Sequence, residues 1–250
     1  MLKKFLVAFG ALAFGAASSL ALAVTADEII DKNLAARGGL PQIKALTSLR
    51  RTGKVILPGA NMDITALRVI QRGGSVRDEF TLQGLTQVNA FDGKQAWKID
   101  PFQGRKDPEK MSADEAKPLL LEGDLDSPLV DYRGKGYTSE YLGMEDVDGT
   151  PAYKLRLRKA SGDEVLYYID PDTSMVIRDV QKQLVRGAEQ ETETDYGEYE
   201  KVGGVYFPMT EQSGSKGSDA SQKQQIVFDK AEANEAPAAG YFSFPAAKQP

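Results

Sequence analysis

The stretch A-Y-K-L-R-L-R-K, residues 152–159, alternates apolar and basic side chains almost residue by residue. Successive side chains of a β-strand point to opposite faces, so this alternation predicts a strand with one face in a core and the other in solvent. The turn Ser161-Gly162-Asp163 leads into a second strand, 164–170, which is apolar on both faces between Val165 and Ile169. This hairpin predicts an antiparallel sheet that is covered on both sides at this point.

Outward from this hairpin, short segments of strand character alternate with turns that contain Gly, Pro or Asp-Gly. Parallel neighbours need crossovers of a dozen or more residues, so strands this closely spaced must pair antiparallel. The predicted strands are 48–57, 62–72, 75–82, 85–91, 94–99, 137–144, 152–159, 164–170, 175–186, 189–199, 205–210 and 222–231.

Two helical segments interrupt the strands. In 27–46, three apolar residues (Ile29, Ile30 and Leu34) share one face before Gly38-Gly39. Ser112 and Glu115 have the spacing of a capping box and predict a helix over 112–121. A long antiparallel sheet must curl or close, and the helices would cover one face. We therefore predict one mainly β domain over 24–250, a large curved antiparallel sheet with an apolar cavity under short α-helices, ending in a flexible tail, 232–250.

The composition excludes several classes of chemistry. The 250 residues include no Cys and no His, which rules out disulfides, thiol nucleophiles, histidine triads and the usual zinc sites. No phosphate-binding glycine motif is present. Asp124, Asp126 and Asp131 suggest calcium, but Pro128 and Lys135 occupy two ligand positions of the EF-hand frame. We therefore expect that the protein is not an enzyme and that it binds no metal and no cofactor.

The first 23 residues have the pattern of a secretory signal peptide. Lys3 and Lys4 precede an apolar stretch that ends at the cleavage motif Ala21-Leu22-Ala23, and Val24-Thr25-Ala26 offers a second motif. Removal of 1–23 takes two lysines away, so the formal net charge of −5 becomes −7. We expect an exported, periplasmic protein, and its acidity argues against nucleic acid as a partner.

A row of acidic residues follows the predicted turn at 187–188. A two-residue loop there would place Arg186 opposite Glu189, and Lys182 opposite Glu193, across the ladder. We interpret the row as a solvated outer face with cross-strand ion pairs. Its members are Glu189, Glu191, Glu193 and Asp195.

The remaining informative residues are apolar or aromatic. A curved sheet with helices over its concave face would enclose a cavity for apolar molecules, and the absence of catalytic motifs favours such a binder over a catalyst. Large apolar or aromatic residues on a strand or on the predicted helical cover are the candidate lining residues of this cavity. They are Trp97, Leu119, Leu120, Tyr168 and Phe207.

Four segments resemble the LolA-like outer-membrane lipoprotein-sorting family. They are A-D-E-I-I-D-K…A-R-G-G (26–39), F-D-G-K-Q-A-W-K-I-D-P (91–101), Y-Y-I-D-P-D-T-S-M-V-I (167–177) and D-Y-G-E-Y…G-G-V-Y-F-P (195–208). The resemblance implies an incomplete antiparallel barrel, capped by helices, with an apolar cavity. It also implies a soluble carrier that takes acylated lipoproteins from an inner-membrane export complex to an outer-membrane acceptor. The family's cavity arginine has two candidates here, Arg51 and Arg68.

The sequence is compatible with three functions. The first is a periplasmic carrier that binds acyl chains of lipoproteins or lipids for transfer towards the outer membrane. The second is a sensor or assembly factor that binds another protein, which a tightly packed interior would favour. The third is an enzyme, which a buried carboxyl with a strongly raised pKa among convergent polar groups would favour.

Overall fold

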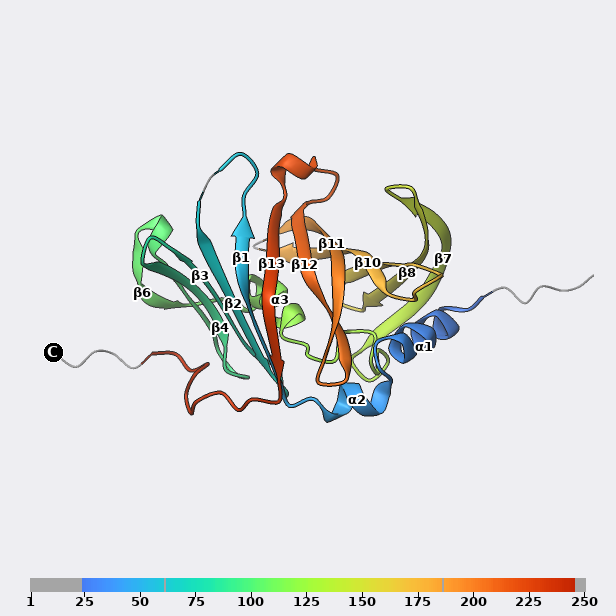
Figure 1. Ribbon diagram of the computed structural model, residues 1–250, viewed down its shortest axis with the longest axis horizontal. Helices are drawn as coiled ribbons and strands as arrows, with labels where there is room; N and C mark the ends of the chain where they lie inside the picture. Colours follow the sequence, from blue (N-terminus) through green and yellow to red (C-terminus); the bar gives the residue numbers. More distant parts are fainter. Residues whose placement is uncertain (1–23, 61, 186, 246–250) are drawn as a thin grey trace, which may run out of the picture.

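The computed structural model describes residues 24–60, 62–185 and 187–245, so the predicted signal peptide lies outside the described residues. Thirteen strands form one antiparallel sheet (Figure 1), in the order β6-β5-β4-β3-β2-β1-β13-β12-β11-β10-β9-β8-β7. The strands are β1 (Ser48–Ile56), β2 (Ile64–Gln71), β3 (Ser75–Leu82), β4 (Leu85–Phe91), β5 (Ala96–Asp100), β6 (Arg105–Lys110), β7 (Tyr137–Val147), β8 (Thr150–Lys159), β9 (Glu164–Ile169), β10 (Val176–Val185), β11 (Ala188–Val202), β12 (Val205–Ser215) and β13 (Gln224–Ala233). The helices are α1 (Ala26–Ala36), α2 (Leu40–Ala45) and α3 (Ala113–Glu122), with short 3₁₀ helices η1 (Pro101–Gln103) and η2 (Ala220–Gln222).

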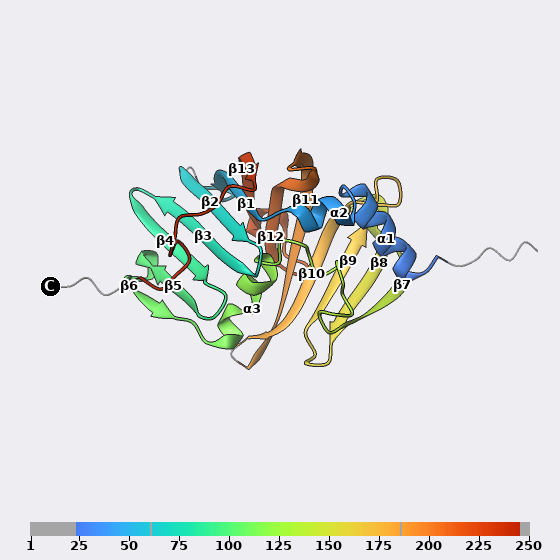
Figure 2. The ribbon, with the colours of Figure 1, turned by 90° about the horizontal axis from the view of Figure 1, so that it is seen from below.

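The sheet is not closed into a barrel, because β6 and β7 form its two edges. These two strands follow one another in the chain, so the segment between them has to cross the whole sheet. Figure 2 shows α3 and the connection to β7 inside the curve of the sheet. We call residues 113–136 the lid, since they cover the concave face and α3 contacts β3, β4 and β10.

At one end of the sheet, α2 lies against the β11–β12 turn, while α1 contacts β7 and its Asn33 side chain donates a hydrogen bond of 2.8 Å to the carbonyl of Ser174. Thr25 caps α1, and its side chain accepts a hydrogen bond from the backbone of Glu28 in a capping box. Cleavage after Ala26 would remove this cap, whereas cleavage after Ala23 keeps it. Between the two helices a Cβ on Gly38 would lie 2.3 Å from the carbonyl oxygen of Gly204, so the close approach requires glycine.

The main core lies between the concave face, the lid and α1. Its buried members include Leu49, Leu155, Leu157, Tyr167, Ile169 and Phe207 from the sheet and Leu119, Leu125 and Leu129 from the lid. Tyr153, Leu155 and Leu157 therefore face this core. Lys154 and Arg156 face outward as predicted, with ion pairs to Glu145 and Glu140 respectively.

The strands β7, β11 and β12 extend beyond their predicted bounds, and two further details of the sheet differ from the sequence prediction. The strand β6 was not predicted, because its sequence R-K-D-P-E-K is charged and contains Pro108, a composition that suits only an exposed edge. The hairpin loop after β10 is 186–187 rather than 187–188, since Val185 pairs with Ala188. Gly187 has a φ of +78°, a conformation that glycine adopts without steric cost.

The shifted loop changes the predicted ion pairs. Lys182 lies opposite Glu191 rather than Glu193, and its amino group is 2.8 Å from the carboxylate of Glu189. Arg186 lies outside the described residues. Glu193 is buried instead of solvated, and the amino group of Lys223 lies 2.6 Å from it and 2.8 Å from Asp195.

The C-terminal segment packs on the convex face through the aromatic residues of the predicted tail. Phe242 is buried, and its carbonyl accepts a hydrogen bond of 2.8 Å from the indole nitrogen of Trp97. The ring of Phe244 meets Trp97 edge-on, with ring centroids 6.1 Å apart. No helix in the described part of the chain has the length and apolar character needed to span a bilayer.

Candidate functional site

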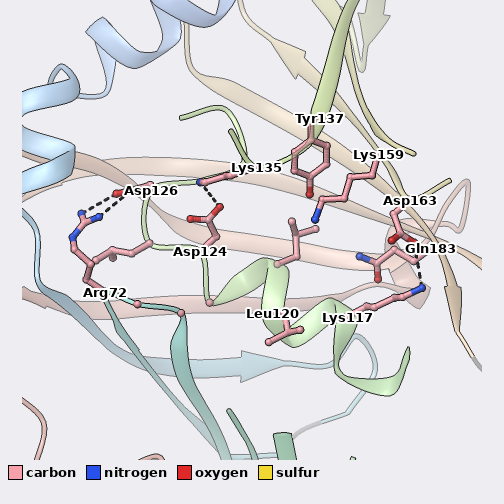
Figure 3. A pocket seen from close by; sticks show the side chains of 15 residues that line it. Arg72, Lys117, Leu120, Asp124, Asp126, Lys135, Tyr137, Lys159, Asp163 and Gln183 are labelled. Atoms are coloured by element: carbon pink, nitrogen blue, oxygen red, sulfur yellow. Dashed lines mark hydrogen bonds and ion pairs between the residues drawn. The ribbon is translucent and has the colours of Figure 1, made fainter. Parts of the chain in front are cut away.

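An inner cavity of about 190 Å³ lies between the concave face and the lid. One side is apolar and aromatic, and the other carries charged groups. The apolar side includes Leu49, Ile70, Leu125, Leu129, Tyr167, Val176, Tyr196 and Phe207. An outer pocket of about 430 Å³ adjoins it (Figure 3), and the two share Leu121, Asp124 and Leu125 of the lid.

The charged side is a network of ion pairs, which we call the ionic belt. The carboxylate of Glu211 accepts hydrogen bonds from Arg51 at 2.8 Å and from Arg68 at 2.9 Å. Arg68 also donates to Asp78 at 2.9 Å and lies 2.7 Å from Glu122 at the end of α3. Burial alone would raise the pKa of Glu211, but the two guanidinium groups outweigh it and hold that pKa below its usual value.

The lid is held to the sheet by polar contacts and by its own apolar residues. Besides the pair between Arg68 and Glu122, the guanidinium of Arg72 binds both carboxylate oxygens of Asp126, at 2.8 and 2.9 Å. Arg72 also donates to the carbonyl oxygens of Leu46 and Ile43, so it joins α2 to the lid. In the described residues the lid pairs with no strand, which leaves side-chain contacts to hold it.

Solved structures with the same overall arrangement were found by comparison. A LolA superfamily protein from Nitrosomonas europaea is 15% identical, with a TM-score of 0.55 over 86% of this chain and 96% of that one. A structure from Vibrio parahaemolyticus is described as an outer membrane lipoprotein-sorting protein domain. It is 10% identical, with a TM-score of 0.54 over 87% of this chain and 96% of that one. A DUF1329 family protein from Desulfovibrio piger is also 10% identical, with a TM-score of 0.56 over the same shares. The chain has a LolA-like fold.

No protein-family model and no curated protein sequence matches the chain. At these identities the structural likeness establishes the fold and not the activity. It confirms the resemblance drawn from the four sequence segments and the predicted architecture of an unclosed antiparallel sheet with few short helices. Both candidate arginines, Arg51 and Arg68, line the inner cavity of this LolA-like fold and share Glu211.

Three of the five predicted lining residues lie on the concave side. Phe207 lines the inner cavity and Leu120 lines the outer pocket. Leu119 is buried in the main core, on the underside of the lid. Whether these residues contact a ligand stays a prediction.

Trp97 and Tyr168 lie on the opposite face of the sheet. Trp97 packs with Val88 and Ala90 beneath the C-terminal segment, and Tyr168 packs with Ala152 and Val180. Their size predicts burial, and both are buried, but by contacts on the convex face. Their placement does not support the predicted role in lining the cavity.

The position of Trp97 leads to a prediction. Trp97→Phe removes the hydrogen bond to Phe242 and part of a fully buried side chain, so it should lower the free energy of unfolding by about 1–3 kcal/mol. Urea unfolding measures this change. Binding of a fluorescent fatty acid to the folded variant should equal that of the parent, and weakened binding would contradict the convex-face assignment.

Tyr167 lines the inner cavity but is not among the predicted lining residues, although the sequence contains a signal for its position. Val165–Ile169 is apolar on both faces, so alternation alone could not orient it. Counting from the turn at 161–163 puts Tyr167 opposite Leu155, on the core face. The roles of Arg72 and Glu122 had no comparable signal, because their partners lie far away in the chain.

Asp179 is a buried carboxyl that faces the inner cavity. One of its oxygens accepts a hydrogen bond of 2.8 Å from the hydroxyl of Tyr196, and the other has no partner among the described residues. Burial raises the pKa of Asp179 to about 7. A buried carboxyl with a strongly raised pKa is one of the features that would favour an enzyme, since such a group suits acid-base chemistry near neutral pH.

The raised pKa predicts a pH-dependent stability. Between pH 4 and pH 7 the folded chain holds a proton on Asp179 that the unfolded chain has lost, so this group destabilises the fold as the pH rises. Asp179→Asn removes the effect. Relative to the parent, the variant should gain up to about 4 kcal/mol between pH 4 and pH 8. Thermal unfolding across this range measures the gain, and a difference that does not change with pH would refute the assignment.

Proposed function

We propose that the chain is a periplasmic carrier that binds acyl chains of lipoproteins or lipids on its concave face, for transfer towards the outer membrane. The observation that supports this is an apolar concave face covered by a lid that pairs with no strand in the described chain. Such a cover can move without breaking the sheet's hydrogen bonds. The export complex and the outer-membrane acceptor implied by the resemblance would be the partners.

Loading requires the lid to move. The inner cavity measures about 190 Å³, whereas pockets that enclose small ligands usually measure roughly 300–1,000 Å³. The present arrangement is therefore a closed state. Displacing the lid would uncover the concave face and make room for an acyl chain.

Release is helped by the lid's own apolar residues. Leu119, Leu125 and Leu129 are buried in the closed state, and an incoming acyl chain would take their place against the sheet. Each buried CH₂ of the chain contributes roughly 0.8 kcal/mol, but exposing the lid residues offsets part of that gain. Binding by exchange would keep the affinity low enough for the cargo to be passed on.

Native mass spectrometry tests the proposal. The protein is purified from the periplasm of its own cells without detergent, and its mass is compared before and after organic extraction. A carrier should show a bound species of lipid or lipopeptide mass that extraction removes. A bare mass, together with failure to take up added fatty acid or lipopeptide, would overturn the proposal.

A second candidate is a protein-binding sensor or assembly factor. The edge strand β7 has eleven residues and exposes Leu142 and Met144, features that suit pairing with a strand of another protein. The interior holds a cavity, so the tight packing expected of a sensor is not found. If the bare protein binds no lipid but retains a periplasmic protein, and Met144→Lys abolishes that retention, this candidate replaces the carrier.

An enzyme has two supporting observations among the described residues, the raised pKa of Asp179 and the pKa of Glu122, which burial raises to about 8. The cavity hydroxyls of Thr194 and Ser213 bond to each other at 2.9 Å rather than to a carboxylate. A carrier has no need of catalysis. Turnover of an acyl ester by the parent, lost in Asp179→Asn, would favour the enzyme.

A further inference from the structure

The outer pocket lies where the lid meets the rim of the sheet. It is bounded by the lid, by the β2–β3 turn and by the inward-facing ends of β7, β8 and β10. Its volume of about 430 Å³ is that of a typical small-ligand site. It shares three lid residues with the inner cavity, so one elongated molecule could occupy both once the lid has moved.

Four cations line this pocket, and three of them have carboxylate partners. Arg72 pairs with Asp126, while Lys135 lies 2.5 Å from Asp124. The amino group of Lys117 lies 3.4 Å from Asp163 and donates to the carbonyl of Leu184 at 3.1 Å. The three acidic residues are thereby neutralised, and the pocket keeps one positive charge in a chain whose formal net charge is −5.

The fourth cation, Lys159, has no carboxylate partner in the part of the chain that the structure describes. Its amino group lies 4.6 Å from the centre of the Tyr137 ring. Lys159 occupies the same inward-facing row of β8 as Leu155 and Leu157, both of which are fully buried. A lysine at the end of a row that is otherwise core directs its charge into the pocket.

Two further donors converge beside Lys159. In Figure 3 the amino group of Lys159 and the amide of Gln183 point into the pocket, next to the hydroxyl of Tyr137. Neither the side-chain amide of Gln183 nor the hydroxyl of Tyr137 bonds to another protein group within 24–60, 62–185 and 187–245. An ammonium, a phenol and an amide around one space can donate together to the oxygens of a phosphate.

We propose that the outer pocket binds the phosphate of an anionic phospholipid headgroup, through Lys159, Tyr137 and Gln183, while the acyl chains enter the inner cavity. This assignment rests on the proposed carrier function and narrows its cargo class. The acyl chains supply the apolar burial, and the pocket selects cargo that carries a phosphate at the head.

Two fluorescent lipids with the same acyl chains, phosphatidylglycerol and diacylglycerol, test the proposal. The parent should bind phosphatidylglycerol at least tenfold more tightly, which is the effect of one hydrogen bond to a charged group. Lys159→Gln should remove most of this preference and leave diacylglycerol binding unchanged. Gln183→Ala should reduce it less, and Lys94→Gln, at the exposed β4–β5 turn, should not change it.

The outcomes separate this inference from the carrier function. Equal binding of the two lipids by the parent, or an unchanged preference in a folded Lys159→Gln, would overturn the headgroup site and leave the carrier function standing. No binding of either lipid would overturn both. Inorganic phosphate that binds the parent as tightly as phosphatidylglycerol would show a site for free phosphate, which also contradicts the headgroup assignment.

Discussion

A disulfide between positions 76 and 123 should abolish acyl-chain uptake until it is reduced. A Cβ on Gly123, at the end of α3, would lie 3.1 Å from the Cβ of Val76 on β3. Disulfides join Cβ atoms about 3.5–4.5 Å apart, so a shift of a few tenths of an ångström suffices. The chain has no cysteine of its own, and Val76→Cys with Gly123→Cys therefore introduces a single possible bridge that fastens the lid to the sheet.

The measurement is the binding of a fluorescent fatty acid before and after a reducing agent is added. We expect the oxidised variant to bind at least tenfold more weakly than the parent and the reduced variant to regain most of the affinity. Val76→Cys alone, treated in the same way, is the control for the substitution. Undiminished binding by a variant whose thiols are fully oxidised would show that cargo does not enter beneath the lid.

Arg68→Met should destabilise the fold by about 3–5 kcal/mol, the usual effect of removing one partner from a buried ion pair. Arg68 is buried and compensates Glu211, Asp78 and Glu122 at once. Its loss leaves Asp78 without this partner and Glu211 with Arg51 alone, and it releases the end of α3. Urea unfolding at pH 7 measures the loss of stability.

The control for this variant is Lys54→Gln, an exposed lysine on β1, which should change stability by less than about 0.5 kcal/mol. The destabilisation by Arg68→Met should also diminish at low pH, where the belt carboxylates become protonated. A loss below about 1 kcal/mol at pH 7 would mean that the ionic belt neither stabilises the concave face nor holds the lid.

Local sequence predicted the sheet well because its turns are explicit. The pairs of glycines at 73–74 and 203–204 and the Asp-Gly pairs at 92–93 and 148–149 fall between consecutive strands of the observed sheet. These local signals do not state which distant segments cover which face. Trp97 illustrates the limit, because the segment that buries it lies 145 residues later in the chain.

The candidate site could be predicted less well from the sequence, because its residues come from segments that are distant in the chain. Arg51 and Arg68 could be singled out, but the belt that they form depends on Glu211 from β12, more than 140 residues away. Lys159 was not singled out, although it follows Leu155 and Leu157 in the inward-facing row. A charge at an inward position of an otherwise apolar row is a signal that a count of alternation can detect.

The central claim is that acyl chains bind on the concave face beneath the lid. The most direct test is photolabelling with a fatty acid that carries a diazirine at the end of its chain, followed by mass-spectrometric mapping of the labelled residues. The account predicts insertion at side chains of the inner cavity, such as Tyr167, Phe207 and Leu125. Labelling confined to the convex face, at Tyr168 or around Trp97, or no labelling above that of a non-binding control protein, would contradict it.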